Sequence, residues 1–217
     1  MVITRNDFEY YVTSANEIII CGAVDKNIKE LVIPSHINRF PVVSIEREVF
    51  KGLQQLTTVK IPDTMELIGN FAFEDCPKLA FVVSEASKLV LGMGAFRNCN
   101  KLKVFANRGL LHCGVETFKD CHKLENFEAN VTCIERGTFS RCRRLRSVHF
   151  SKQLSSFDGK AFYDCRELSC LFFEGNYARF KNMRTEDFCN ITIFCTETSS
   201  LIDLAPLGYS VCVRDYL

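Results

Sequence analysis

The chain has 217 residues, of which 47% are apolar and 24% are charged, and its formal net charge is +1. This length fits one domain or two small ones, and the apolar fraction excludes a disordered chain. A net charge near zero gives no reason to expect a nucleic-acid binder as a whole. The longest apolar run, Ile18–Val24, is too short for a membrane span of about 20 residues. Arg5, Asn6 and Asp7 stand where a signal peptide would need its apolar stretch, so no export signal is expected.

The N-terminal part of the chain predicts a β-hairpin. The segments Phe8–Val12 and Glu17–Cys21 are rich in apolar and β-branched or aromatic residues, with a short polar connection between them. We expect this hairpin to cover one end of the hydrophobic core.

The middle of the chain is a repeat of 21 to 23 residues. One phenylalanine per unit recurs at spacings of 23, 23, 22, 21 and 23 residues: Phe50, Phe73, Phe96, Phe118, Phe139 and Phe162. Three residues after these phenylalanines stand Leu53 and then five cysteines: Cys76, Cys99, Cys121, Cys142 and Cys165. A leucine lies six residues after every phenylalanine, and the residue five before is apolar. Such aligned columns are typical of a solenoid, in which each unit buries its apolar side against its neighbours.

Each unit predicts one turn and one short strand. In Ala72–Leu79 the apolar residues are three apart, which favours a helical or 3₁₀ turn. The segment Leu56–Ile61 ends in period-two alternation, which favours a strand with Val59 and Ile61 facing inward. Stacked units then form a parallel sheet, and the phenylalanine column forms a continuous aromatic ladder in the core.

The C-terminal part of the chain follows the columns less closely. The polar segment Glu174–Asp187 fits no column and is interpreted as a loop or short helix. After it, Ile191–Cys195 predicts a last strand, Leu201–Leu204 a short helical stretch and Tyr209–Val213 a final strand.

The unit Ala-Phe-x-x-Cys-x-x-Leu-x-x-Val, with Ile61-Pro62 closing the strand, resembles the BspA-like leucine-rich repeats. The segment Ile28–Ile45 resembles the N-terminal cap of that family, and the last strands resemble its closing unit. The resemblance implies an α/β repeat fold, a curved right-handed solenoid with a concave parallel β-sheet and a short helical or irregular convex side. It further implies an N-terminal cap at 1–44, six repeats at 45–173 and a C-terminal cap at 174–217. The family is used for protein binding, so the resemblance implies no chemistry. Because Ile-Pro recurs only at Ile33-Pro34 and Ile61-Pro62, we expect irregular stacking in the middle units.

The cysteines are expected to be structural. The chain contains 12, and a column that accepts either leucine or cysteine is an apolar position, where a free thiol behaves as a small hydrophobe. We therefore expect the five column cysteines to be reduced, buried and unpaired. A column of free thiols favours the cytoplasm, whereas family precedent allows a cell-surface or secreted protein.

No catalytic residue, metal site or cofactor is expected. The pairs His112-Cys113 and Cys121-His122 contain zinc-ligand types, but their columns turn the cysteines inward and the histidines outward, and zinc needs four convergent ligands. The chain has no glycine-rich phosphate loop and no nucleophile motif. The sequons at Asn130 and Asn190 matter only in a secreted eukaryotic chain.

Two surfaces are candidates for binding a partner. Five residues after the phenylalanines lies a basic column, Lys78, Lys101, Lys123 and Arg144, which fits either a solvated face or a docking stripe for an acidic protein or a polyanion. The second candidate consists of strand residues that alternate with the inward ones and should face the concave side: Phe81, Val83, Val104, Ala106, Asn126, Glu128 and His149. The apolar members are adjacent in neighbouring units, and such a patch marks a partner site, unless a one-residue register slip turns them inward.

The sequence therefore favours a monomeric, non-enzymatic protein-interaction module whose protein partner binds the concave face. No nucleic acid is expected as a partner, because no aromatic residues interleave with the basic column. The first alternative is a cell-surface adhesin that binds host or neighbouring-cell proteins, which would need an export signal. The second is a thiol or metal-dependent enzyme, which would need an accessible Cys/His cluster.

Overall fold

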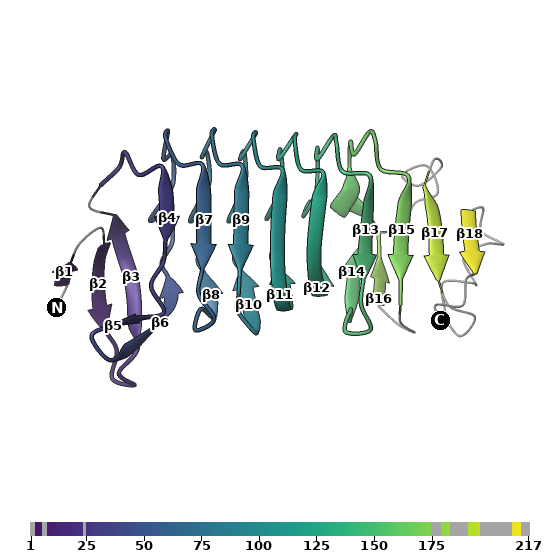
Figure 1. The fold of residues 1–217 in the computed structure, drawn as a ribbon. Coiled ribbons are helices and arrows are strands. Elements are labelled where there is room, and N and C mark those ends of the chain that lie inside the picture. The colour runs from purple at the N-terminus through teal and green to yellow at the C-terminus, as the bar shows by residue number, and fades with distance from the viewer. Residues whose placement is uncertain are drawn as a thin grey trace.

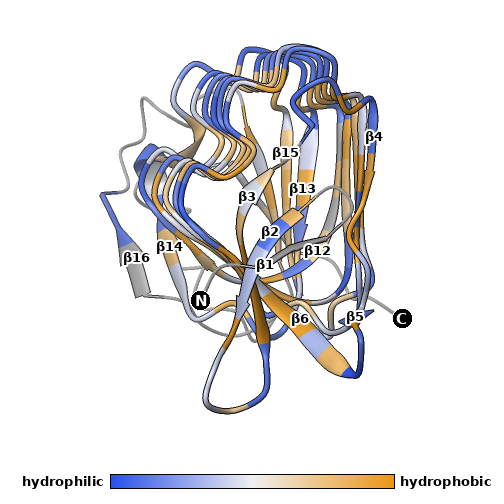
Figure 2. Cartoon of the chain, turned by 90° about the vertical axis from the view of Figure 1, so that its left-hand side faces the viewer, coloured by the Kyte–Doolittle hydropathy of each residue, from blue (hydrophilic) through white to orange (hydrophobic). Residues whose placement is uncertain are grey.

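The computed structural model describes residues 3–5, 8–23, 25–174, 179–182, 191–195 and 210–213. Its units stack into a β-solenoid of parallel strands (Figure 1). Viewed along the stack, the units superimpose around a single core (Figure 2). Each unit runs through a strand of a first sheet, a strand of a second sheet and a segment of turns that carries the repeated phenylalanine.

The first sheet contains the strands that the repeat columns predict. Its members are β4 (Glu30–Val32), β7 (Thr58–Ile61), β9 (Phe81–Ser84), the first halves of β11 (Val104–Cys113) and β12 (Asn126–Ile134), β13 (Ser147–Phe150), β15 (Cys170–Phe173), β17 (Thr192–Cys195) and β18 (Ser210–Val213). Val59 and Ile61 face the core while Lys60 is exposed, so the predicted alternation is confirmed.

The second sheet was not expected from the sequence. It contains β3 (Ile18–Ala23), β6 (Phe40–Ile45), β8 (Leu67–Ile68), β10 (Lys88–Leu91), the second halves of β11 and β12, β14 (Ser156–Asp158) and β16 (Arg179–Lys181). The apolar residue five before each phenylalanine supplies its inward side chains, as Ile68 and Leu91 illustrate. The side that we expected to be helical or irregular therefore includes a hydrogen-bonded parallel sheet.

The N-terminal hairpin is present. β2 (Phe8–Val12) pairs antiparallel with β3, and β1 (Ile3–Arg5) adds to β2. The ring of Phe8 meets that of Phe50 edge-on, with centroids 6.3 Å apart, so the hairpin contacts the end of the aromatic ladder. A short strand, β5 (His36–Ile37), pairs with β6 beside it.

Among the described residues, the expected helical or 3₁₀ turn is present around Phe162, as the 3₁₀ helix η1 (Gly159–Phe162), whereas the other repeated phenylalanines lie in turns that form no helix. The reason lies in the backbone donors. The N–H of Phe73 donates to the carbonyl of Ala95 at 2.8 Å, and that of Phe96 to Thr117 at 2.9 Å, so these groups bond to the next unit and not within a helix. Left-handed residues two positions after the phenylalanine, such as Asp75 with φ 58°, interrupt the helical conformation as well.

The predicted aromatic ladder is confirmed. The six repeated rings are buried, and consecutive members stack with centroids 5.1 to 5.6 Å apart. Phe105 and Phe127 add edge-on contacts to it, for example 4.9 Å between Phe105 and Phe118. The ladder therefore joins all six units through one run of packed rings.

Unit length controls the continuity of the strands. The 23-residue units contain a loop between their two strands, as between β7 and β8 or between β13 and β14. The 22- and 21-residue units have no loop, and one strand, β11 or β12, runs through both sheets with bulges between them. The irregularity expected in the middle units is thus a continuous strand in place of two.

The first sheet is interrupted where the shortest unit meets a longer one. β12 still pairs with β14 in the second sheet, but the described residues form no ladder between β12 and β13, and Figure 1 shows the wider separation there. Two extra residues correspond to about 7 Å of extended chain. Because of this difference, β12 keeps register with its neighbour in only one of the two sheets.

The C-terminal part differs from its expectation in one segment. Arg179–Lys181, interpreted as loop or short helix, forms β16 and pairs with β14. The strand expected at Ile191–Cys195 is present as β17, and β18 covers most of the strand expected at Tyr209–Val213. The stretch Leu201–Leu204 lies outside the described residues.

Candidate partner-binding face

The outward residues of the first sheet form two rows that follow the strand register. Phe81 of β9 lies between Thr58 and Val104, and Val83 lies between Lys60 and Ala106. Phe81 is 45% exposed and Val83 is 42% exposed, while Val104 and Ala106 are half-buried. Their strand neighbour Val82 is buried. The structure therefore places these four side chains on one face, and no register slip turns them inward.

The remaining predicted members lie farther along the sheet. Asn126 and Glu128 pair in β12 with Val104 and Ala106, but their side chains lie outside what the structure describes. His149 is exposed on β13, beyond the interruption of the sheet. The structure therefore joins the four apolar residues closely, and His149 lies across the interruption, where it lines a common groove with Val83 and Ala106.

An aromatic row on the same face was missed as a site. The ring of His149 stacks on Phe172 with centroids 4.2 Å apart, and Phe172 stacks on Phe194 at 4.7 Å. Val32 of β4, which is 56% exposed, lies on the same face at the other end and is separated from Val83 by the exposed Lys60. Extending the alternation of the repeat columns to β4 and β17 would have found Val32 and Phe194.

A groove of about 560 Å³ opens on this face at the C-terminal ends of the first-sheet strands, where the sheet is interrupted. The groove lies where one column of inward residues, at the ends of the first-sheet strands, carries small side chains. That column holds large apolar residues in most units, Ile33, Ile61, Phe150 and Phe173, but Ser84, Asn107 and Ala129 in three consecutive ones. The smaller side chains leave the groove, which the buried Phe127 also lines.

Asn107 is a buried polar residue in this groove. Its Nδ2 donates to the carbonyl of Gly109 at 2.8 Å, whereas its Oδ1 has no hydrogen-bond partner among the described residues. The rim carries an exposed ion pair between Arg108 and Glu85, 3.2 Å apart. The groove thus combines an apolar floor with polar groups, next to the exposed apolar residues Val83 and Ala106.

The cysteines of the repeat column line the core. They are free thiols and are buried except Cys165, which is half-buried and so corrects that expectation. Burial raises the pKa of the Cys99, Cys121 and Cys142 thiols well above the usual value, and that of Cys165 to about 12. These thiols are therefore protonated near neutral pH, and the thiolate is the nucleophile and metal ligand.

The two His-Cys pairs point as their columns predict. Cys113 and Cys121 are buried, His112 is exposed, and Nδ1 of His122 lies 3.0 Å from the carbonyl oxygen of Arg141. In the part of the chain that the structure describes, no group of three or more His, Cys, Asp or Glu side chains converges as metal ligands would.

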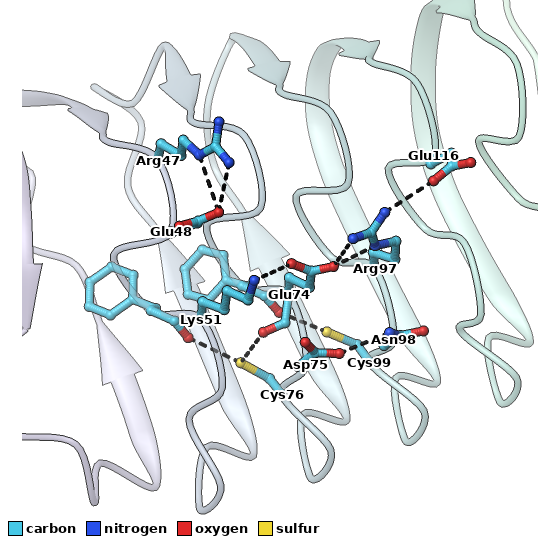
Figure 3. A network of polar contacts seen from close by, with 12 residues as sticks. Arg47, Glu48, Lys51, Glu74, Asp75, Cys76, Arg97, Asn98, Cys99 and Glu116 are labelled. Carbon is cyan, nitrogen blue, oxygen red and sulfur yellow. Dashed lines mark hydrogen bonds and ion pairs between the residues drawn. The ribbon is translucent and has the colours of Figure 1, made fainter.

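The turn side carries an ion-pair network (Figure 3). The Glu74 carboxylate is 2% exposed and pairs with Lys51 at 2.9 Å and with Arg97, which also reaches Glu116 at 3.3 Å. The Arg97 guanidinium lies 4.9 Å from the centroid of the Phe71 ring. The network links the turn segments of four units and leaves Glu74 fully satisfied, so we assign it to stability and not to binding.

No helix of the described residues is long and apolar enough to cross a membrane.

The sequence profile of the family described as BspA type leucine rich repeat region matches the chain in six copies, over residues 23–130 and 112–199. No curated protein sequence matches.

Several solved structures share the fold. A leucine-rich repeat protein of T. pallidum is 24% identical over 97% of this chain and 97% of its own, with a TM-score of 0.67. A leucine rich cell surface protein of Faecalibacterium prausnitzii is 20% identical over 92% of this chain and 55% of its own, with a TM-score of 0.62. A leucine-rich repeat protein of Bacteroides ovatus is 22% identical over 91% of this chain and 60% of its own, with a TM-score of 0.57.

Proposed function

Because the chain belongs to the BspA-type leucine-rich repeat family, we propose that it is a protein-interaction module that binds a partner on its first sheet. The observation that carries this proposal is the exposure of Phe81 and Val83 side by side with Val104 and Ala106. Adjacent exposed apolar side chains of this kind mark interaction sites. The strands hold them in a fixed grid, so a partner pays little ordering entropy when it binds.

The face has the composition of an interface. Phe81 is the proposed anchor, because large aromatic side chains dominate interface energies. Asn126, Glu128 and His149 supply a polar rim on one side in this proposal, and the His149–Phe172–Phe194 row supplies a second aromatic area. The proposal assigns no catalytic step to the chain.

The test compares two matched pairs of substitutions. Phe81→Ser with Val83→Ser alters the first sheet, and Leu67→Ser with Val90→Ser alters residues of the second sheet that are 41% and 42% exposed. Both variants should melt nearly as the unchanged protein does, because exposed residues contribute little to the core. The unchanged protein and the Leu67/Val90 variant should capture the same proteins from the source organism. The Phe81/Val83 variant should capture less of these proteins by a factor of more than about ten. Equal capture by all three proteins would overturn the proposal.

A cell-surface adhesin is the second candidate, and the name of the F. prausnitzii protein, a leucine rich cell surface protein, favours it. Surface-restricted proteolysis of intact source cells separates the two. An adhesin is cleaved under these conditions, whereas an intracellular module is protected until the cells are lysed.

A further inference from the structure

Four lysines gather where three strands of the first sheet begin. Lys78, Lys101 and Lys123 belong to the basic column, at the corner before β9, β11 and β12, and Lys103 directly precedes Val104 of β11. Lys123 is half-buried and the other three are exposed. We refer to these four residues as the lysine cluster.

The lysine cluster has no neutralising carboxylates among the described residues. None of its members forms an ion pair there, and the Lys78 ammonium donates to the neutral Gln55 amide at 2.7 Å. Arg144, the last member of the basic column, is different because it pairs with Glu125 at 3.0 Å. Asp75, three residues before Lys78, instead accepts a hydrogen bond from Asn98 at 2.8 Å.

Asp120 does not neutralise the lysine cluster either, and the pKa of Lys123 responds to the charges of the neighbouring lysines. Asp120, three residues before Lys123, pairs with Arg141 at 3.4 Å. The pKa of Lys123 is lowered, first by the charge of Lys101 and less by Arg144 and Lys103. The Lys123 ammonium is therefore repelled by those of Lys101 and Lys103, and a bound anion would relieve that repulsion.

The lysine cluster adjoins the apolar residues of the candidate face. Lys103 stands next to Val104 in the chain, and Phe81 and Val104 are the first residues of β9 and β11. On the other side, the exposed Lys60 pairs in register with Val83. The apolar centre of the face thus has a positively charged border along the strand starts.

We propose that the partner bound by this face is a protein with an acidic segment, whose carboxylates lie against the lysine cluster while its apolar side chains cover Phe81 and Val83. This proposal rests on the function proposed above and specifies the chemistry of the partner. Complementary charge at the border of an interface steers association and fixes the orientation of the partner.

The surroundings of the lysine cluster favour a protein over a nucleic acid or polyphosphate. The cluster contains lysines, which bind as point charges, and no arginine fork that would grip a phosphate in two places. The exposed ring beside the cluster, Phe81, lies among Val83 and Val104 and not between the lysines, so it does not alternate with them as rings that stack successive bases would. The adjoining Phe81 and Val83 require apolar groups in the partner, which a polyphosphate lacks.

The experiment measures binding of a short oligo-glutamate peptide to the whole chain, with the corresponding oligo-glutamine peptide as control. Oligo-glutamate should bind at low salt and weaken as salt rises, whereas oligo-glutamine should not bind. The double change Lys101→Gln and Lys123→Gln should weaken binding about fivefold to tenfold, because each exposed ion pair contributes modestly. The pair Lys88→Gln and Lys160→Gln, exposed lysines outside the cluster, should leave it unchanged.

Additional peptides and variants distinguish failure of the acidic-segment proposal from failure of the binding-face proposal. A peptide with leucines between glutamates should bind more tightly than oligo-glutamate, and Phe81→Ser with Val83→Ser should abolish only that gain. If oligo-glutamate binds equally to the unchanged protein and to the Lys101/Lys123 variant, or binds to neither, the acidic-segment proposal is overturned while the binding face itself stands. If polyphosphate or a single-stranded oligonucleotide binds at these lysines more tightly than either acidic peptide, the partner is a polyanion and the proposal is likewise overturned.

Discussion

The thiol of Cys99 donates a hydrogen bond to the main-chain carbonyl of Phe73, one unit earlier, across 3.1 Å. The same bond recurs along the column, from Cys76 to Phe50 at 3.2 Å and from Cys165 to Phe139 at 3.0 Å. The column cysteine is therefore a small apolar side chain that also carries a donor for a buried carbonyl. Leucine serves at position 53, where the preceding segment is the hairpin and not a unit with a repeated phenylalanine.

This bond predicts different effects for two substitutions of the buried Cys99, one that removes the donor and one that keeps it. Cys99→Val keeps the apolar volume but removes the donor, so it should cost about 1 kcal/mol of the free energy of unfolding, because a buried carbonyl loses its partner. Cys99→Ser keeps a donor and should cost less than Cys99→Val. Urea melts of the three proteins measure the order, and a valine variant as stable as the unchanged protein would show that the bond contributes nothing.

The buried thiols predict lower stability at alkaline pH. Burial raises the pKa of Cys99, Cys113, Cys121, Cys142 and Cys165, so these groups stay protonated in the folded chain while those of the unfolded chain ionise above about pH 8.5. The unfolded chain then binds fewer protons than the folded one, so the free energy of unfolding falls as pH rises.

The fall should begin near pH 8.5 and amount to about 1.4 kcal/mol per pH unit for each such thiol once the unfolded thiols are ionised. Urea melts at pH 7, 9 and 10 measure it, with a reductant present to prevent disulfide formation. For each thiol the loss should be full only above its folded-state pKa, which is about 12 for Cys165. A free energy of unfolding that stays constant from pH 7 to 10 would mean that the thiols are not buried.

Removal of one ring should disrupt the aromatic ladder. Phe96 is fully buried between Phe73 and Phe118, with ring centroids 5.2 and 5.6 Å away. Phe96→Ala should therefore cost about 3–5 kcal/mol, from lost burial and from the cavity that remains. Tyr163→Ala, at an exposed aromatic residue, is the control and should cost little. A loss below about 1 kcal/mol for Phe96→Ala would contradict the ladder.

Substitution of Glu74, the buried carboxylate of the ion-pair network on the turn side, should lower the free energy of unfolding. Glu74→Gln removes the carboxylate that Lys51 and Arg97 share, and we expect a cost of about 1–3 kcal/mol, reduced from that of a fully buried pair because both cations are partly exposed. Glu125→Gln, at the exposed pair with Arg144, should cost less than about 1 kcal/mol. Equal costs for the two variants in denaturant melts would argue against a special role for Glu74.

The groove predicts that an added apolar side chain is tolerated at one alanine and rejected at another. Ala129 lines the groove, so Ala129→Ile should stabilise the fold by about 1 kcal/mol by filling space. Ala95 is fully buried in the small-residue column before Phe96, so Ala95→Ile should destabilise it by about 1–3 kcal/mol through overpacking. Destabilisation of similar size at both positions would mean that the groove is closed in solution.

Spacing and side-chain class were enough to predict the units, the inward columns and the exposed face. Spacing alone placed Phe50 through Phe162 in one buried ladder, and strand alternation turned Phe81 and Val83 outward. These features depend on side-chain class and period within one unit, which are local properties of the chain. The free thiols of the five column cysteines followed from the same columns, since a position that also accepts leucine is apolar.

The hydrogen bonds and strand continuity between units could be seen only in the folded chain. The spacings of 22 and 21 residues are visible in the sequence, but the continuous strands β11 and β12 and the interruption before β13 arise when units of unequal length lie side by side. Likewise the donor of Phe73 bonds to Ala95 in the next unit, which forms turns where local spacing favoured a helix. Hydrogen bonds and register between units are non-local, so periodicity within a unit does not specify them.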